Sequence, residues 1–410
     1  MHQLRELLAE LWADRRRLRL VVVALAWGTL GLTVLAGFGE GFDRAMRGVL
    51  AQSGDRMIRV QPGSTSQVFE GRAAGRVVEL DSRAIAAIRS EPAFVRTSVE
   101  YVAGGRILAE GRSRSASIRG VEQDFARIRG LRLDADGRFL SDLDVRERRR
   151  VVVLGRTLAR GLFGDKSAIG RTVRIGTQPY RVIGLVSPRA TVSNYDGDDD
   201  GKAFVPSSTL LAVSNVRWAS YVVAELGDPS QHTKVVTRLR AALGGVLGFD
   251  PRDDRAIHIV DHVALTDRIL ALVLGSRWFL LAVGVLGLCV AAVGIGNSMH
   301  ALVVERTAET GLRMALGATR AQIMSKPLLE SLLLVMVGGG VGFGAGMLLL
   351  AGIDLLPLPS TTREYLGSPV PTVGVAVGVA ALLGLVAGFA GVAPARRAAN
   401  VDPIVALRAE

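Results

Sequence analysis

The chain alternates between long apolar blocks and segments in which polar and apolar residues follow regular periods. Four apolar blocks lie at residues 18–38, 278–299, 328–352 and 371–394. Each holds the roughly 20 residues that a helix needs to cross a hydrocarbon core of about 30 Å. We therefore predict four transmembrane helices. Residues 39–277 contain no such block and are expected to form a stalk and a separate large domain.

Helical spacing of apolar residues extends beyond the first two blocks. Phe42, Met46 and Val49 repeat at steps of three and four before Gly54, so the first span is expected to continue as a stalk. The same period resumes at about residue 263 and enters the second block without a break. The sequence thus predicts a second stalk helix that is continuous with the second span.

Between the two stalks the period changes to two, which is typical of strands. Two helices are expected among the strands, at about 82–90 and about 229–243, because Asp81 and Asp228 are suitable N-caps. The order of elements near 56–103 resembles that near 220–262. We predict an α+β domain of two related halves, with residues 105–215 inserted between them. The expected strands are 57–62, 77–80, 97–102, 115–121, 172–176, 180–186, 203–206, 221–226 and 256–262.

The positive residues of the short connections indicate the orientation, because such residues stay in the cytoplasm. They gather in residues 1–17, in residues 300–327 and in the tail 395–410, whereas the loop 353–370 has only Arg363. Residues of about 40–270 and the loop 353–370 are therefore expected outside the cytoplasm.

Two alternatives stay open for the N-terminal residues. Residues 1–17 have apolar residues at helical spacing, which predicts an amphipathic helix on the cytoplasmic membrane face or a packed helix. The first apolar block could be a cleaved secretory signal, but its length favours a retained anchor.

Charge and composition narrow the possible partners. The net charge is +12 at a mean hydropathy of +0.32, and most of the excess lies in the predicted external domain. Such a surface suits anionic lipid or an acidic partner rather than nucleic acid, although an arginine-rich solvated surface explains it equally well. The single cysteine, Cys289, excludes an intrachain disulfide.

No motif for catalysis or metal binding stands out, so we predict no catalytic residue, no metal site and no cofactor on this chain. The phosphate-binding pattern GxxxxGK[ST] is absent, and "GLFGDKS" at 161–167 only approaches it. His258 and His262 fall on an expected strand, where a spacing of four separates them too widely for a shared metal. "DGDDDG" at 196–201 begins like a calcium loop but has Ser207 where a glutamate is required, so it is an exposed acidic turn or a weak cation site.

A charged segment, "ERTAETGLRMALGATRAQI" at 305–323, interrupts the apolar C-terminal half. Interpreted as one helix, it places Glu309 and Arg313 four residues apart as a favourable pair. Its apolar stripe would comprise Ala308, Leu312, Ala315, Leu316, Thr319 and Ile323.

Glycines at steps of four mark the last two spans and predict close helix packing or a dimer seam. These helix-packing residues are Gly338, Gly342, Gly346, Gly374 and Gly378.

The segment 305–323 resembles the signature of FtsX-like permeases, which is close to ER-x-x-E-I-G-x-x-[RK]-A-[LI]-G-A-[TS]-[RK]-x-x-I. Residues 151–186 are similar to the external domain of MacB-type exporters, and residues 394–410 to the C-terminal tail of the family. By this resemblance the domain at 39–277 is expected to be a MacB-type periplasmic core, and the segment 300–327 the coupling helix. The coupling residues would be Glu305, Arg306, Glu309, Gly311, Leu312, Arg313, Leu316, Gly317, Ala318 and Arg320.

The resemblance implies a permease in the inner membrane of a bacterium. It would pair with a second copy or a homologous permease, contact membrane lipid, and bind a cytoplasmic ABC ATPase dimer that holds ATP and magnesium. MacB carries its ATPase at the N-terminus, where this chain starts with its first helix, so a separate ATPase is expected. A periplasmic adaptor is a further possible partner.

Three functions fit such a permease. Export of a drug, peptide or lipid-like molecule is favoured by the size of the external domain and by the motif at 151–186. Mechanical activation of a cell-wall hydrolase and lipoprotein release are the alternatives.

Overall fold

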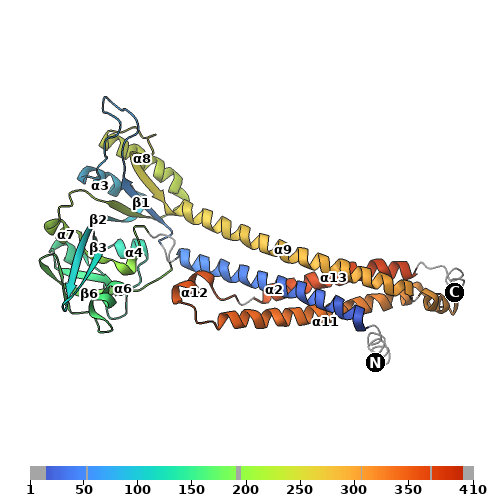
Figure 1. The fold of residues 1–410 in the computed structure, drawn as a ribbon. Coiled ribbons are helices and arrows are strands. Elements are labelled where there is room, and N and C mark those ends of the chain that lie inside the picture. Colours follow the sequence, from blue (N-terminus) through green and yellow to red (C-terminus); the bar gives the residue numbers. More distant parts are fainter. Residues whose placement is uncertain (1–14, 52–53, 191–194, 306, 370–371, 400–410) are drawn as a thin grey trace. The chain divides into compact units, whose positions relative to one another are not determined.

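A computed structural model describes residues 15–51, 54–190, 195–305, 307–369 and 372–399. The chain divides into two compact units. The membrane unit comprises the residues up to Met46 and those from Leu272 onward, and the extracytoplasmic unit is Arg47–Ala271. Figure 1 shows the helices and strands of both units. The predicted helix within residues 1–17 and the tail 395–410 lie largely outside the described residues.

Four helices in the described part of the chain are long and apolar enough to cross a membrane. They are α2 (Arg15–Ala51), α9 (His262–Glu305), α11 (Arg320–Asp354) and α13 (Val373–Ala399). The first three predicted spans fall within these helices, and the fourth, 371–394, starts two residues before α13, with residue 371 outside the described part. Both expected helical continuations are confirmed, because α2 extends to Ala51 and α9 starts at His262.

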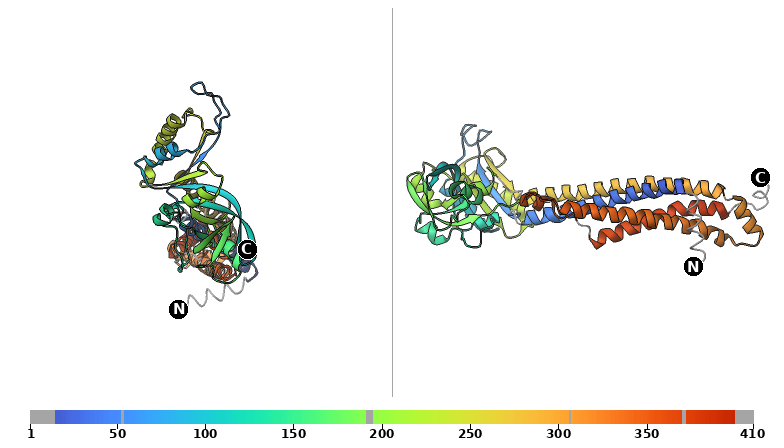
Figure 2. Two further views of the ribbon diagram at one scale, coloured as in Figure 1. Left: turned by 90° about the vertical axis from the view of Figure 1, so that its left-hand side faces the viewer. Right: turned by 60° about the horizontal axis from the view of Figure 1, so that its bottom comes forward.

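The four long helices lie side by side in the membrane unit, as Figure 1 and the right-hand view of Figure 2 show. Their shared core includes Leu25 and Leu32 of α2, Ile295 of α9 and Val335 of α11. A short helix, α12 (Ser360–Leu366), forms within the predicted loop 353–370. Arg363 holds it by donating hydrogen bonds to the carbonyls of Asp354 and Leu356, at 3.1 and 3.0 Å.

The extracytoplasmic unit contains one sheet of nine strands in the order β3-β7-β4-β6-β5-β2-β8-β1-β9. The strands are β1 (Met57–Pro62), β2 (Phe94–Ala109), β3 (Arg112–Val121), β4 (Val151–Gly155), β5 (Thr172–Ile175), β6 (Gln178–Val186), β7 (Ala203–Pro206), β8 (Tyr221–Leu226) and β9 (Ile257–Asp261). Six helices of this unit are α3 (Ser82–Arg89), α4 (Phe125–Arg129), α5 (Asp142–Arg146), α6 (Arg156–Phe163), α7 (Ser207–Val213) and α8 (His232–Leu247).

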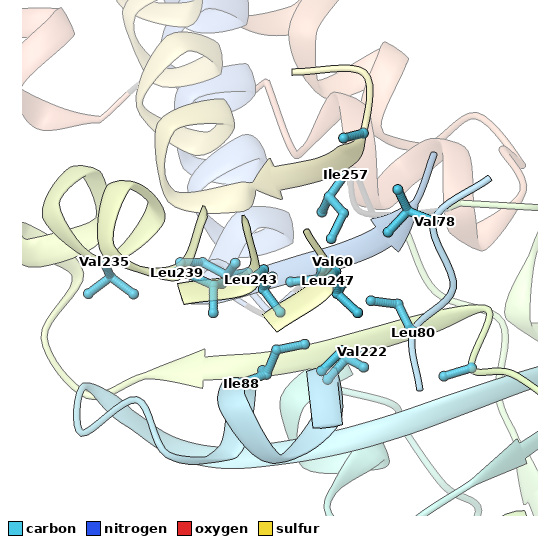
Figure 3. Packing of buried hydrophobic residues seen from close by; sticks show 14 of the residues in the cluster. Val60, Val78, Leu80, Ile88, Val222, Val235, Leu239, Leu243, Leu247 and Ile257 are labelled. Atoms are coloured by element: carbon cyan, nitrogen blue, oxygen red, sulfur yellow. The ribbon is translucent and has the colours of Figure 1, made fainter. Parts of the chain in front are cut away.

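The two predicted halves are confirmed as the units β1-α3-β2 and β8-α8-β9. Their strands interleave as an antiparallel sheet, in which Met57 pairs with Glu225 and Val60 with Ile259. Helices α3 and α8 cover this sheet, and Figure 3 shows the side chains between them. Asp81 caps α3 as predicted, accepting a hydrogen bond from the Ala84 amide at 2.9 Å. Leu80 and Ile88 are fully buried in this core.

The predicted insertion at 105–215 forms a part of its own. β2 is long enough to pair with β3 and β5 as well as with β8. Further pairs join β3 to β7, β7 to β4, β4 to β6 and β6 to β5, so six strands close into a ring. A second apolar core, with Leu162, Val182 and Val205 among its members, packs here.

One predicted strand is wrong, and one strand was not predicted. Residues 77–80 make only isolated bridges, because Val78 and Leu80 turn alternate side chains into the core without a strand ladder beside them. Residues 151–155 form β4, which a period of two does not reveal. Its valines and leucine are almost all buried, and a strand buried on both faces has a continuous apolar run.

A group of charged side chains is buried near β2 and β3. Glu100 of β2 accepts hydrogen bonds from Arg119 of β3 at 2.9 Å and from the Tyr195 hydroxyl at 2.6 Å. Asp199 accepts from Arg129 at 2.8 Å and from Lys202 at 3.0 Å. Burial alone would raise the pKa of Asp199, but these two cations outweigh it and lower that pKa.

The acidic stretch 196–201 is therefore only partly an exposed turn. Asp196 and Asp198 are exposed, whereas Asp199 is buried and its carboxylate is held by protein cations. The sequence prediction misses this because Arg129 and Asp199 are 70 residues apart. Side chains of the protein occupy the position that a metal ion would need at Asp199.

Candidate functional site

The charged segment between α9 and α11 folds as a short helix and a tight turn. α10 (Thr307–Ala315) begins shortly after α9 ends at Glu305. The Thr307 hydroxyl donates to the carbonyls of Val303 and Val304, at 3.1 and 2.8 Å, which joins the two helices closely. Arg306 lies outside the described residues.

The turn after α10 is a Schellman motif. Gly317 has a left-handed φ of +94° and donates its N–H to the Met314 carbonyl at 3.0 Å. Ala318 donates to the Arg313 carbonyl, also at 3.0 Å. A side chain in the left-handed region costs roughly 1–2 kcal/mol, so glycine is the favoured residue here.

α11 begins immediately after this turn with a capping box. The Thr319 hydroxyl accepts from the Gln322 amide at 3.4 Å, and the Gln322 side chain accepts from the Thr319 amide at 2.9 Å. The single helix predicted across 305–323, and within the range 300–327, is therefore wrong. The apolar stripe is divided by the turn: Ile323 is buried on α11, whereas Leu312 and Leu316 are exposed.

α10 and the turn after it expose two leucines beside an ion pair. Leu312 is 52% exposed and Leu316 is 80% exposed. Glu309 accepts a hydrogen bond from Arg313 at 2.5 Å, and both side chains are about half exposed. Such a pair stabilises the helix by only about 0.3–0.5 kcal/mol. Its main effect is to hold the two charges in defined positions on the surface. An apolar centre with a charged rim is the usual composition of a protein-docking surface.

The remaining predicted coupling residues surround this face in different ways. Glu305 and Arg320 are exposed, and Gly311 is buried. Gly317 and Ala318 take part through their backbone N–H groups, whose hydrogen bonds close the turn. The structure thus brings most of these residues to one helix and its turn.

A pocket of about 320 Å³ lies beside α10. It is lined by Leu302 of α9, by Glu309 and Arg313 of α10, and by Gln322 and Glu330 of α11. The lining offers hydrogen-bonding and charged groups next to apolar carbon. A side chain of a docked protein could enter a pocket of this size.

Sequence reasoning missed Gln322 and Glu330, although both gave a signal. A threonine followed three residues later by glutamine is a helix-start pattern. Glu330 is a lone acid within the predicted span 328–352, and such residues are functional candidates by default. It is only 3% exposed.

The first three glycines of the predicted ridge pack α11 against α2. A Cβ added at Gly342 would lie 2.2 Å from the Ala26 carbonyl oxygen, and one at Gly346 would lie 2.9 Å from Cβ of Thr33. At Gly338 the nearest atom, a methyl carbon of Leu25, would be at 3.0 Å. At these three positions α11 lies close to α2, and the contact is within one chain.

The two glycines of α13 do not bring another described helix close, and their part in a dimer seam stays a prediction. A Cβ at Gly378 would meet nothing within 4 Å, and the nearest atom to one at Gly374 would be Oγ1 of Thr372 at 3.5 Å. These glycines face away from the described neighbours, so their spacing alone does not define a contact.

The described residues contain no group of three or more His, Cys, Asp or Glu side chains that could hold a metal ion. His258 is exposed on β9, whereas His262 is buried at the start of α9. The absence of a metal or cofactor on the whole chain stays a prediction.

Comparison with known proteins matches both parts of the chain. The family model described as "MacB-like periplasmic core domain" matches residues 20–242, and "FtsX-like permease C-terminal" matches residues 281–403. The macrolide export ATP-binding/permease protein MacB of Azoarcus sp. (strain BH72) is 30% identical, over 99% of this chain and 59% of that protein. MacB of Chromobacterium violaceum is also 30% identical, over 99% of this chain and 62% of that protein. The chain spans about three fifths of the length of these relatives.

Solved structures also align with the chain. The periplasmic region of MacB from Actinobacillus actinomycetemcomitans aligns with a TM-score of 0.43 at 20% identity, over 54% of this chain and 95% of that one. The extracellular domain of the transporter YknZ from Gram-positive bacteria aligns with a TM-score of 0.41 at 16% identity, over 50% of this chain and 99% of that one.

Proposed function

Because the chain belongs to the family of ABC transporter permeases with a MacB-like periplasmic core domain, we propose that a cytoplasmic ATPase docks on α10 and the turn that follows it. The observation that carries the proposal is the exposed pair Leu312 and Leu316 beside the Glu309–Arg313 ion pair. Exposed leucines on a polar, cytoplasmic segment suit a surface that a partner covers.

ATP and magnesium bind to that ATPase and not to this permease part. The absence of the pattern GxxxxGK[ST] from these 410 residues supports this assignment.

Movement at α10 reaches the extracytoplasmic unit through α9. The boundary between the two units falls inside this helix, after Ala271, and the helix runs from His262 to Glu305 in one piece. An uninterrupted helix resists bending, so a displacement of its cytoplasmic end is transmitted to its other end.

The cargo is a drug-like, peptide or lipid-like molecule that the protein exports from the bacterial inner membrane or periplasm. The protein's relatives are named macrolide export proteins, which supports export over hydrolase regulation and lipoprotein release. A second permease copy completes the transporter, and a periplasmic adaptor is a further expected partner.

The test is co-purification of the ATPase with variants of the docking face. Leu316→Glu is expected to weaken binding by about ten-fold or more, because burying a leucine is worth about 1.5–3 kcal/mol and 1.4 kcal/mol is ten-fold. Val68→Glu, at an exposed position of the extracytoplasmic unit, is the matched control and should bind like the parent chain.

A charge-swapped variant, Glu309→Arg with Arg313→Glu, separates docking from helix stability. It keeps an intrachain ion pair, weakened because the acid now follows the cation and both oppose the helix dipole, and it presents the opposite charges to a partner. Loss of ATPase binding is expected with only a small fall in the unfolding temperature, because exposed pairs of this kind are worth about 0.3–0.5 kcal/mol. If both Leu316→Glu and the charge swap retain the ATPase at parental affinity and activity, the docking assignment is wrong.

A further inference from the structure

A large pocket lies in the extracytoplasmic unit beside α4 and has no part in the proposed ATPase docking. Its volume is about 1030 Å³, at the upper end of the roughly 300–1,000 Å³ of small-molecule sites. The walls come from the start of β1, from the segment 123–133 that contains α4, from residues 139–142 and from Glu225 of β8. All of these residues belong to one compact unit (Figure 1).

Backbone contacts fix the shape of this pocket. α4 ends in a Schellman motif, in which Gly130 has a φ of +63° and Leu131 donates to the Ala126 carbonyl at 2.8 Å. Gly54 also has a left-handed φ, +69°, and a Cβ there would lie 2.4 Å from the Ile128 carbonyl oxygen. The start of β1 therefore lies directly against α4, so the pocket is largely formed before any ligand binds.

One side of the pocket is apolar. Leu131, Leu133 and Phe139 line it and are only half-buried, so part of their carbon surface faces the open space. Leu140 and Ile128 are buried behind them in the core shared with β4 and β7. This wall can accept an apolar body of a ligand.

The carboxylates of the pocket are mostly engaged by arginines. Glu225 accepts from Arg96 at 2.7 Å, and the same guanidinium lies 4.0 Å from Asp124. Asp142 pairs with Arg146 at 2.8 Å. These acids are therefore largely neutralised within the protein.

Two arginines of the lining have no such partner. Arg56 and Arg127 are exposed, and neither side chain has a hydrogen bond or ion pair with another described residue. Among the described lining residues, Asp55 is the one carboxylate without a hydrogen bond or ion pair, and it is half-buried. Free guanidinium groups beside an apolar wall favour a ligand that carries an acid, because arginine binds carboxylate and phosphate oxygens through paired N–H donors.

We propose that this pocket binds an amphiphilic anion, whose apolar body lies on Leu131, Leu133 and Phe139 and whose carboxylate or phosphate is held by Arg56 and Arg127. Asp55 adds an acceptor that suits a hydroxyl or amine of the ligand and disfavours a second acidic group. The site stands on its own geometry and does not depend on the docking of an ATPase.

The test uses photo-crosslinking of the full chain in phosphatidylcholine nanodiscs without ATPase. The probe is dodecanoic acid with a diazirine in its chain, and dodecanol with the same diazirine is the uncharged partner. Crosslinked peptides are identified by mass spectrometry. The acid is expected to label residues 123–142 about ten-fold more than the alcohol, because hydrogen bonds to charged groups are worth about 1.5–3 kcal/mol.

Three variants make the result specific. Arg56→Gln with Arg127→Gln should reduce labelling by the acid to that by the alcohol. Leu131→Gln should reduce labelling by both probes. Arg174→Gln, an exposed arginine on β5 outside the pocket, should behave like the parent chain. Equal labelling by acid and alcohol in the parent chain, or an advantage of the acid that survives the double variant, would overturn the proposal.

Nanodiscs that contain phosphatidylglycerol distinguish a membrane lipid from a free amphiphile. If the lipid headgroup fills the site, labelling by the acid falls in these discs; if a free amphiphile is the ligand, labelling persists. Either result supports the anion site and identifies its source. Because no ATPase is present, failure of this experiment leaves the proposed docking face untouched.

Discussion

Replacing Gly342 by alanine should separate two membrane helices. An ideal Cβ at this position lies 2.2 Å from the Ala26 carbonyl oxygen, whereas ordinary contact begins at 3.4 Å. α2 and α11 would therefore have to move apart locally by about 1.2 Å, the difference of these two distances. A change of side-chain rotamer cannot relieve this clash, because the atoms nearest to the added Cβ belong to the backbone of α2.

The cost follows from overpacking. Inserting a methyl group into a closely packed contact typically destabilises by about 1–3 kcal/mol, and the separation would also loosen the contacts at Gly338 and Gly346. Alanine gains up to about 1 kcal/mol over glycine in helix propensity, which offsets part of this. We expect a net loss of about 1–2 kcal/mol.

The assay is unfolding of the detergent-solubilised chain by sodium dodecyl sulfate, followed by circular dichroism. Gly344→Ala is the matched control, since it lies two residues away on the same helix and its Cβ would meet nothing within 4 Å. It should be as stable as the parent chain or slightly more stable. If Gly342→Ala is no less stable than Gly344→Ala, the α2–α11 contact is not formed as described.

Three further predictions concern buried charge and the turn. Asp199→Asn should destabilise the extracytoplasmic unit by about 3–5 kcal/mol in a thermal melt, because it leaves Arg129 and Lys202 buried without their counter-charge; a loss below 1 kcal/mol would contradict this. Burial alone would raise the pKa of Asp144, but hydrogen bonds from Arg138 and Ser141 outweigh it and lower that pKa from 3.8 to about 2. This carboxylate therefore contributes about 2 kcal/mol above pH 4, which is lost as the pH falls towards 2; Asp144→Asn should be less stable at pH 7 and should flatten the acid limb of a stability–pH curve. Gly317→Ala should cost about 1–2 kcal/mol and reduce ATPase co-purification, and unchanged binding would show that the turn is not needed for docking.

Sequence patterns predicted the elements that show a regular apolar period or an apolar run long enough to span a membrane. The four spans, the stalk portions of α2 and α9, and the two related halves of the sheet all followed from period and length. β4 escaped because both of its faces are buried. The short helices α4, α5 and α7 have five to seven residues, too few to establish a helical period.

At the candidate site, the residues of the coupling segment were predicted but their arrangement was not. The helical spacing continues across Gly317 by coincidence, so the stripe did not reveal the turn. Long-range contacts were beyond sequence reasoning altogether. Nothing local indicates that Asp199 pairs with Arg129, or that Gly54 lies against Ile128.

The interleaved sheet also sets an order for biosynthesis. β1 is made and translocated first, yet the described strands that pair with it are β8 and β9, and Met57 pairs with Glu225, 168 positions later in the chain. The six strands of the inserted ring all lie within residues 94–206, and the ring has its own apolar core. It can therefore form while β8 is still being synthesised. Until then β1 is an unpaired strand beside the membrane, open to association with other chains. Mutations that slow formation of the ring should therefore reduce the yield of inserted protein more than they reduce the stability of the finished molecule.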